Sequence, residues 1–387
     1  MSFLKKHGAE QKKMPKARNY KFYNMPQEYG LKDYKETEDY IVKRYSKIRN
    51  LIAIYTWGYV SIPGISDIDV VLVFDNREDY ALPFSKRSFY FLNAKTRYLA
   101  RHPFIFIDKD SFADIRYVYQ NTDFRLLYGN SIKINKLSPL ENYYSSIALL
   151  NDIIIRHYPR DFLIQFANRS INVRDTLLRL NSLKYTVKAL ESLTKEKNKN
   201  WLEKLELIED LRKNWFEENN FDVLVMLNKN AIKMAIGIIE RFQKFLIKNK
   251  IVEIISGNTV RYNGIKNKSL FVKEWSKDKA LHDMIKNFKN KKKFYSTLPI
   301  ELSAQLIEYS NYKGVISRYI KKNVGNHLDY QIKHKNVIEN RINILNKQAE
   351  LASKLKHSDF AAFFDFGYRN KSGLNNWVLS LLDKARF

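Results

Sequence analysis

Two aspartates separated by one residue, Asp67 and Asp69, open an apolar run that continues to Phe74. If this run is a β-strand, its side chains alternate between faces, so both carboxylates project from the same side a short step apart. Carboxylates so placed can hold Mg²⁺ or Mn²⁺, because these ions favour oxygen ligands and share their coordination shell with substrate phosphates. The pair therefore indicates metal-assisted chemistry at a phosphate group.

A segment with turn-forming residues leads into the aspartate pair. Gly58 begins this segment, and the dipeptide Pro63-Gly64 interrupts it. Residues 70–74 show no polar alternation, which is typical of a strand covered on both faces and would anchor the carboxylates in the core. An Asp-x-Asp sequence at a strand start also occurs in simple polar turns. The preceding glycine and the wholly apolar strand favour a functional site over such a turn.

This arrangement resembles the DNA polymerase β-like nucleotidyltransferase superfamily, whose signature is a Gly-Ser or Gly-Gly pair, a short loop, and an acidic pair leading a hydrophobic strand. Gly58 holds the glycine position, and Asp67 and Asp69 match the paired metal ligands. The second position is Tyr59, where the family has a small residue that lets the backbone approach the triphosphate. The candidate triphosphate-binding residues are therefore Gly58 and Tyr59, with Ser61 or Ser66 supplying the missing hydroxyl.

The downstream sequence extends the resemblance to about residue 150. An apolar run that starts at Pro103 ends at Asp108, and the later Leu-Tyr-Gly at 127–129 looks like many small members of the superfamily. The resemblance implies a third carboxylate on the third core strand, which acts as general base or third metal ligand. Asp108 is the natural candidate. Asp110, Asp114 and loss of the base are alternatives that the sequence leaves open.

Composition excludes several classes of protein. The chain has 387 residues, 45% hydrophobic content and no cysteine. It is long enough for two or three packed domains, and disulfides and thiolate metal sites are excluded. No apolar stretch has the length of a signal-peptide core or of a membrane span, so we expect a cytoplasmic protein that does not enter a membrane.

The charge of the chain is strongly positive. The formal net charge is +27, of which residues 1–150 carry +8 and residues 151–387 carry +19. A basic excess of this size favours RNA or another polyanion as a partner, although a Lys/Asn/Ile bias from an AT-rich genome would produce the same excess. Lysines are interspersed with aromatic residues at 269–279 and 287–296, which is typical of a single-stranded nucleic-acid surface or of a solvated face above core aromatics.

The expected elements give an α/β (α+β) nucleotidyltransferase core with a mixed sheet, followed by a mainly α-helical region. Periodicity predicts a helix at 33–49, a strand at 51–60, a helix at 85–101 and a strand at 103–108. Further helices are predicted at 139–157, 173–195, 199–217, 222–249, 277–290, 299–322, 333–357 and 374–384, with a hairpin at 251–262. The predicted organisation is a basic flexible arm at 1–30, the catalytic domain at 31–137, and a basic helical region at 138–387, divisible into 138–250 and 251–387.

The resemblance implies a Mg²⁺-dependent enzyme that moves a nucleoside monophosphate from a nucleoside triphosphate to an acceptor hydroxyl. An RNA 3′ end is one acceptor, and the positive charge supports it. The alternatives are a small-molecule or protein acceptor, or a non-catalytic member that binds nucleotide or nucleic acid only. Two features support the non-catalytic alternative: Tyr59 replaces a small residue, and Asp108 stands at the end of its apolar run instead of inside it. Fold class alone does not decide among them.

Overall fold

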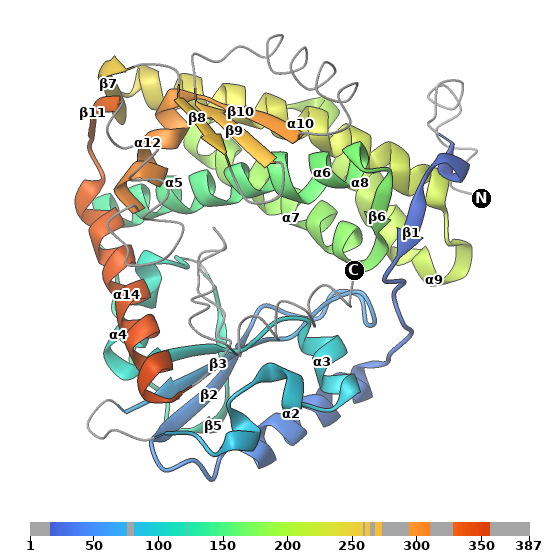
Figure 1. Ribbon diagram of the computed structural model, residues 1–387, viewed down its shortest axis with the longest axis vertical. Helices are drawn as coiled ribbons and strands as arrows, with labels where there is room; N and C mark the ends of the chain where they lie inside the picture. The colour runs from blue at the N-terminus through green and yellow to red at the C-terminus, as the bar shows by residue number, and fades with distance from the viewer. Residues whose placement is uncertain are drawn as a thin grey trace. The chain divides into compact units, whose positions relative to one another are not determined.

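The computed structural model describes residues 16–75, 81–120, 122–257, 260–263, 268–272, 294–309 and 328–356. They form two compact units (Figure 1). The α/β unit takes residues 29–149, 309–319 and 334–387, and the helical unit takes residues 1–28, 150–308 and 320–333. Each unit is thus assembled from separate segments of the chain.

A mixed four-stranded sheet forms the centre of the α/β unit, with strand order β4-β3-β2-β5. β3 runs parallel to β4 and antiparallel to β2, and β2 also pairs antiparallel with β5. The mixed sheet within an α+β fold agrees with the predicted fold class. The strands are β2 (Leu51–Trp57), β3 (Asp69–Phe74), β4 (Ile105–Asp108) and β5 (Phe124–Gly129).

One face of this sheet packs against α2 (Leu31–Tyr45) and α3 (Ala94–Ala100). On α2, Tyr34, Ile41 and Tyr45 recur at helical spacing and are buried, as are Thr37 and Glu38. The exposed positions of this stretch are Lys35, Glu36, Asp39 and Lys43. Each large apolar side chain buried in this way contributes about 1.5–3 kcal/mol. The sheet residues in this core are Leu51, Ile54, Val70, Leu72, Phe74 and Phe106.

Aromatic side chains gather on the other face of the sheet. Trp57 on β2 lies opposite Asp69 on β3, so the two share this face. The Trp57 ring lies 5.5 Å from the Tyr119 ring and 6.0 Å from the Phe124 ring, measured between centroids. Phe112 of α4 (Lys109–Ala113) lies 5.2 Å from Phe124. These aromatic side chains lie beside the start of β3.

The Leu-Tyr-Gly element ends β5, and its last position requires glycine for a steric reason. Gly129 has φ +84°, and a Cβ atom there would overlap the carbonyl oxygen of Ile52 on the neighbouring strand. Only glycine allows this close approach of the two backbones. The element therefore fixes how β5 pairs with β2.

The last described helix, α14 (Lys335–Lys354), belongs to the α/β unit and not to the helical region that the sequence predicts for it. Gln348 donates a hydrogen bond from Nε2 to the Phe106 carbonyl of β4 at 3.0 Å. The fully buried Arg341 donates to the Tyr309 hydroxyl at 2.8 Å and to the Tyr117 carbonyl at 2.7 Å. A segment far along the chain thus completes the unit that contains β3.

In the helical unit, α7, α8 and α10 contact one another. The predicted apolar stripe of α7 is confirmed, since Leu177, Leu180, Leu183, Val187 and Leu190 are fully buried. The helices are α6 (Ile164–Ala167), α7 (Val173–Thr194), α8 (Lys199–Lys213), α9 (Trp215–Glu218), α10 (Phe221–Lys248) and α12 (Ile300–Glu308), while α5 (Pro139–Arg156) carries the chain between the units. A π-helical segment covers His157–Leu163. None of the helices in the described ranges is both long and apolar enough to cross a membrane.

Two predictions about the strands of this unit are wrong. Part of the expected flexible arm is a strand, β1 (Lys21–Tyr23), which pairs in parallel with β6 (Ser170–Asn172). The expected hairpin at 251–262 is absent from the described pairings, because β7 (Val252–Gly257) pairs with β11 (Leu328–Ile332). A separate three-stranded sheet contains β8 (Val260–Asn263), β9 (Lys268–Val272) and β10 (Phe294–Leu298). The predicted helices at 277–290 and 374–384 lie outside the described residues.

Candidate metal centre

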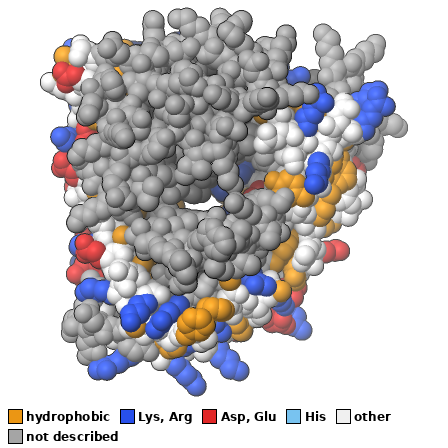
Figure 2. All heavy atoms as spheres, viewed as in Figure 1, with side chains coloured by type: hydrophobic (Ala, Val, Ile, Leu, Met, Phe, Trp, Pro, Cys, Tyr) orange, Lys and Arg blue, Asp and Glu red, His pale blue; other side chains and the backbone are white. Residues whose placement is uncertain are grey.

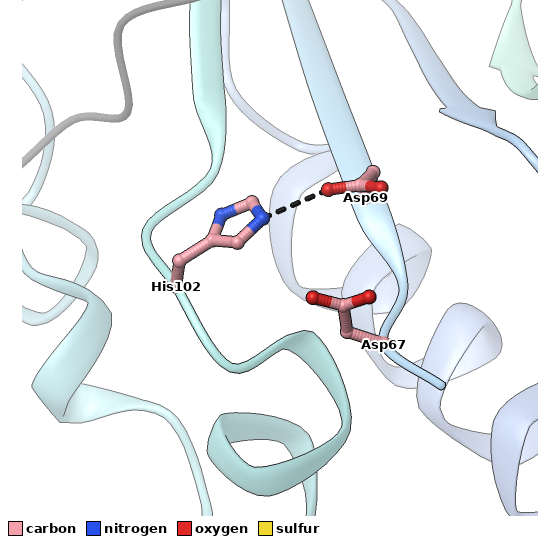
Figure 3. A group of neighbouring side chains, drawn as sticks. All are labelled: Asp67, Asp69 and His102. Atoms are coloured by element: carbon pink, nitrogen blue, oxygen red, sulfur yellow. Dashed lines mark hydrogen bonds and ion pairs between the residues drawn. The ribbon is translucent and has the colours of Figure 1, made fainter. Parts of the chain in front are cut away.

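Asp67, Asp69 and His102 come together at the start of β3 (Figure 3). One potential ligand atom from each residue lies within 4.8 Å of those of the other two. Asp69 is the first residue of β3, and Asp67 precedes it in the segment that enters the strand. Among the described residues, this is the group of three whose side chains could hold a metal ion.

Parallel pairing brings His102 to the aspartates. Val71 on β3 lies level with Ile105 on β4, so the residues just before β4 lie beside the first residues of β3. His102 and Pro103 occupy that position, between the end of α3 and the start of β4. The sequence shows His102 only as a histidine next to a strand, and its role depends on knowing which strands are neighbours.

A tight turn at Arg101 directs His102 into the site. Arg101 has φ +59° and ψ −37°, and the His102 amide donates a hydrogen bond to the Ala100 carbonyl at 2.6 Å. This is the rare form of γ-turn, which a residue other than glycine adopts only with strain. Such strain costs about 1–3 kcal/mol and is found mainly where function requires an unusual geometry.

Both residues of this turn contact the aspartates. Arg101 Nη1 lies 3.2 Å from Asp67 Oδ2, and His102 Nε2 lies 2.8 Å from Asp69 Oδ1. The second ring nitrogen of His102, Nδ1, lies 2.8 Å from the Pro103 carbonyl oxygen. Since a carbonyl oxygen only accepts, Nδ1 must carry a proton, and Nε2 is left to donate to Asp69 or to bind a metal ion.

The pKa values of this pair are shifted in a consistent way. Burial raises the pKa of Asp69, and the charge of Asp67 adds to this effect, while the hydrogen bond with His102 opposes it. Burial lowers the pKa of His102, but the hydrogen bond and charge of Asp69 outweigh it, so that the pKa lies above its ordinary value. Both shifts favour the protonated form, so this pair holds a proton more tightly than the free side chains do.

The loop before the aspartates is held by two tyrosines. The Tyr34 hydroxyl donates to the Ser66 carbonyl at 2.6 Å and accepts from the Gly64 amide at 3.0 Å. The Tyr98 hydroxyl donates to the Gly64 carbonyl at 2.7 Å. Because Tyr34 belongs to α2 and Tyr98 to α3, the helices fix the path of the chain into β3.

The four candidate triphosphate residues differ in accessibility. Gly58 has φ +72°, and nothing lies within 4 Å of the place where a Cβ would stand, so its backbone is open to a ligand. Tyr59 is 77% exposed and Ser61 is also exposed. Ser66 is buried, and its hydroxyl accepts a hydrogen bond from the Ile62 amide at 3.1 Å. Ser66 thus stabilises the turn, whereas Gly58, Tyr59 and Ser61 are exposed to solvent.

Asp108 does not join the other carboxylates. It lies level with Phe74, at the opposite end of β3 from Asp69, about 17 Å along the strand. It is 1% exposed, and its Oδ1 accepts a hydrogen bond from the Ser111 amide at 2.9 Å, which caps α4. Asp110 and Asp114, in and just after α4, follow it at that end. The expectation of a third carboxylate from β4 at this site is therefore corrected, because in a parallel pair the end of β4 lies beside the end of β3. The third side chain next to Asp67 and Asp69 that could hold a metal ion is His102.

Two carboxylates, an imidazole and a guanidinium in one place can bind a divalent cation and neutralise an anionic substrate beside it. Comparison with protein-family models, with curated proteins and with solved structures finds no match to this chain. The arrangement of Asp67, Asp69 and His102 is therefore the basis on which a function can be proposed.

Proposed function

We propose that this protein is a metal-dependent nucleotidyltransferase, which moves a nucleoside monophosphate from a nucleoside triphosphate to an acceptor hydroxyl. The observation that carries the proposal is the grouping of Asp67, Asp69 and His102 at the start of a central strand. The order of α2, β2, the Gly58 turn and β3 supports it, because the superfamily that the sequence resembles has this order.

Transfer of a phosphoryl group depends mainly on positioning and on neutralising charge. A divalent cation at the site would supply most of the positive charge at the phosphates. Asp67 and Asp69 would hold the cation, and His102 would complete the protein ligands. Arg101, whose guanidinium lies 3.2 Å from Asp67, would add a second positive group beside the phosphates. The open backbone at Gly58 leaves room for the triphosphate to approach the turn.

The acceptor is proposed to be an RNA 3′ end, since the net charge of +27 favours a polyanionic partner. On the face drawn in Figure 2, Lys and Arg side chains lie singly or in small groups, with Asp and Glu side chains between several of them. The lysines at 291–293 lie outside the described residues. The distance of Asp108 from the aspartate pair favours the second candidate, a member that binds nucleotide without transferring it.

The direct test incubates the full chain with each nucleoside triphosphate labelled at the α-phosphate, with Mg²⁺ or Mn²⁺, and with RNA, a small alcohol or no acceptor. We expect label in the acceptor and release of unlabelled pyrophosphate. Asp67→Asn and Asp69→Asn should lose this transfer, because each removes the charge of one metal ligand and no apolar contact. Asp39→Asn is the matched control, since Asp39 is an exposed carboxylate on α2. Nucleotide binding without transfer would favour the non-catalytic candidate, and equal transfer by Asp69→Asn would refute the mechanism.

A further inference from the structure

The third group at the candidate metal centre is an imidazole and not a carboxylate. Mg²⁺ takes oxygen ligands and retains much of its water, whereas imidazole nitrogen suits transition metals. Mn²⁺ accepts carboxylate oxygen and also binds more tightly than Mg²⁺ to a site that contains nitrogen. We infer that this centre selects Mn²⁺ over Mg²⁺, and that His102 is the residue that sets the preference. The inference concerns the metal of the proposed function, but its test does not require nucleotidyl transfer.

A backbone contact outside the cluster orients the His102 ring, and this favours His102 as a metal ligand. Nδ1 lies 2.8 Å from the Pro103 carbonyl oxygen, and this contact leaves Nε2 on the side of Asp69. A hydrogen bond from the far ring nitrogen to a backbone carbonyl fixes the tautomer and orientation of metal-binding histidines. Pro103 is itself buried next to β4, so the carbonyl is held by the core of the α/β unit.

The chain also keeps His102 in place through its backbone. The turn begins at Ala100, which is fully buried, as is the preceding Leu99. On its other side, β4 pairs with β3 from Ile105 onwards. The turn is therefore fixed at both ends, and the direction of the His102 side chain does not depend on contacts with the aspartates alone.

The ligand set is compatible with a working metal site. Three protein ligands, two of them carboxylates, leave positions for phosphate oxygens or water around a six-coordinate ion. A carboxylate in place of His102 would give three oxygen donors, which is the type of set that Mg²⁺ accepts. Substitution at this single position should therefore change the preference between the two ions and leave a site that still binds metal.

The experiment measures Mn²⁺ binding to the full chain by the electron paramagnetic resonance signal of free Mn²⁺, and Mg²⁺ binding by competition at the same pH. We expect the wild-type protein to bind Mn²⁺ more tightly than Mg²⁺ and Asp69→Asn to lose most of the binding. His102→Asp and His102→Glu, which differ in reach, should reduce the preference for Mn²⁺, measured as the ratio of the two dissociation constants. Asp39→Asn should keep the wild-type ratio, and circular dichroism should show that each variant is folded.

Equal affinity of the wild-type protein for both ions would overturn the inference, as would a wild-type ratio in both carboxylate variants or the absence of Mn²⁺ binding. These outcomes are distinguishable from a failure of the proposed function. Selective Mn²⁺ binding without nucleotidyl transfer would leave the inference standing and refute the transfer reaction. Nucleotidyl transfer by a protein that binds Mg²⁺ as tightly as Mn²⁺ would refute the inference and support the transfer reaction.

Discussion

Replacing Arg101 with glycine should give a more stable protein than replacing it with alanine. Arg101 has φ +59°, in the centre of the turn that directs His102. Both substitutions remove the guanidinium and its ion pair with Asp67, so this loss cancels when the two variants are compared. The remaining difference is the backbone, because alanine keeps the strain of the turn and glycine does not.

The size of the effect follows from two opposing terms. The strain of the turn lowers the free energy of unfolding by about 1–3 kcal/mol for a residue with a Cβ, and glycine avoids this loss. Glycine loses about 0.5–1 kcal/mol through the greater freedom of its unfolded chain. We therefore expect Arg101→Gly to exceed Arg101→Ala by about 1 kcal/mol in free energy of unfolding. The same freedom should loosen His102, so that Arg101→Gly binds Mn²⁺ more weakly than Arg101→Ala.

Urea unfolding followed by circular dichroism measures the first effect, and Mn²⁺ titration measures the second. Asp39 on α2 provides the matched control, since it is exposed and forms an ion pair with Lys35 that both of its substitutions remove. There the order should reverse, with Asp39→Gly about 1 kcal/mol less stable than Asp39→Ala in a helix interior. If Arg101→Gly is no more stable than Arg101→Ala, the turn is not strained and does not hold His102 at a cost.

Three further predictions concern other parts of the chain. Asp108→Ala should lower the free energy of unfolding by about 1 kcal/mol through loss of the α4 cap. Asp108→Asn should keep a capping oxygen and normal nucleotidyl transfer. Loss of transfer in Asp108→Asn would instead assign the role of general base to Asp108. Hydrogen bonds from Ser138 and Tyr117 lower the pKa of Glu141, so its contribution to stability is present above the ordinary carboxyl pKa and is lost as pH falls through the lowered value. Urea midpoints of Glu141→Gln should then depend less on pH in this acid range than those of the wild type, and parallel pH profiles would contradict the assignment. Replacing the lysines at 291–293 with glutamine should flatten the salt dependence of RNA binding, whose log–log slope is about −0.7 per phosphate contact on a single strand; binding that does not respond to salt would exclude this surface.

The aspartate pair could be predicted because its evidence is local. A turn, two acids and an apolar strand follow one another in the sequence, and the alternation of side chains along a strand brings Asp67 and Asp69 together. His102 could not be found in this way, since its place depends on β4 lying parallel beside β3. The same pairing places Asp108 at the opposite end of β3 from Asp69. The sequence shows only that Asp108 ends an apolar run. Position within a run does not say at which end of a sheet a residue lies.

The fold shows the same difference between local and long-range information. The apolar stripe of α7 was visible as a spacing of three and four residues, and its burial follows directly from that pattern. No periodicity in α14 indicates that Gln348 will bond to Phe106, 242 residues earlier. The pairing of β7 with β11 is equally distant in sequence, whereas a hairpin is the arrangement that adjacent residues suggest. Such contacts depend on which surfaces are left to cover after the local elements have formed.

The most direct measurement of the central claim is a crystal structure of the full chain grown with Mn²⁺ and a non-hydrolysable nucleoside triphosphate, with data collected at a wavelength where manganese scatters anomalously. We predict an anomalous peak about 2 Å from a carboxylate oxygen of Asp67, a carboxylate oxygen of Asp69 and Nε2 of His102, with phosphate oxygens beside it. A manganese peak at another place, or bound nucleotide with no metal between these three side chains, would contradict it.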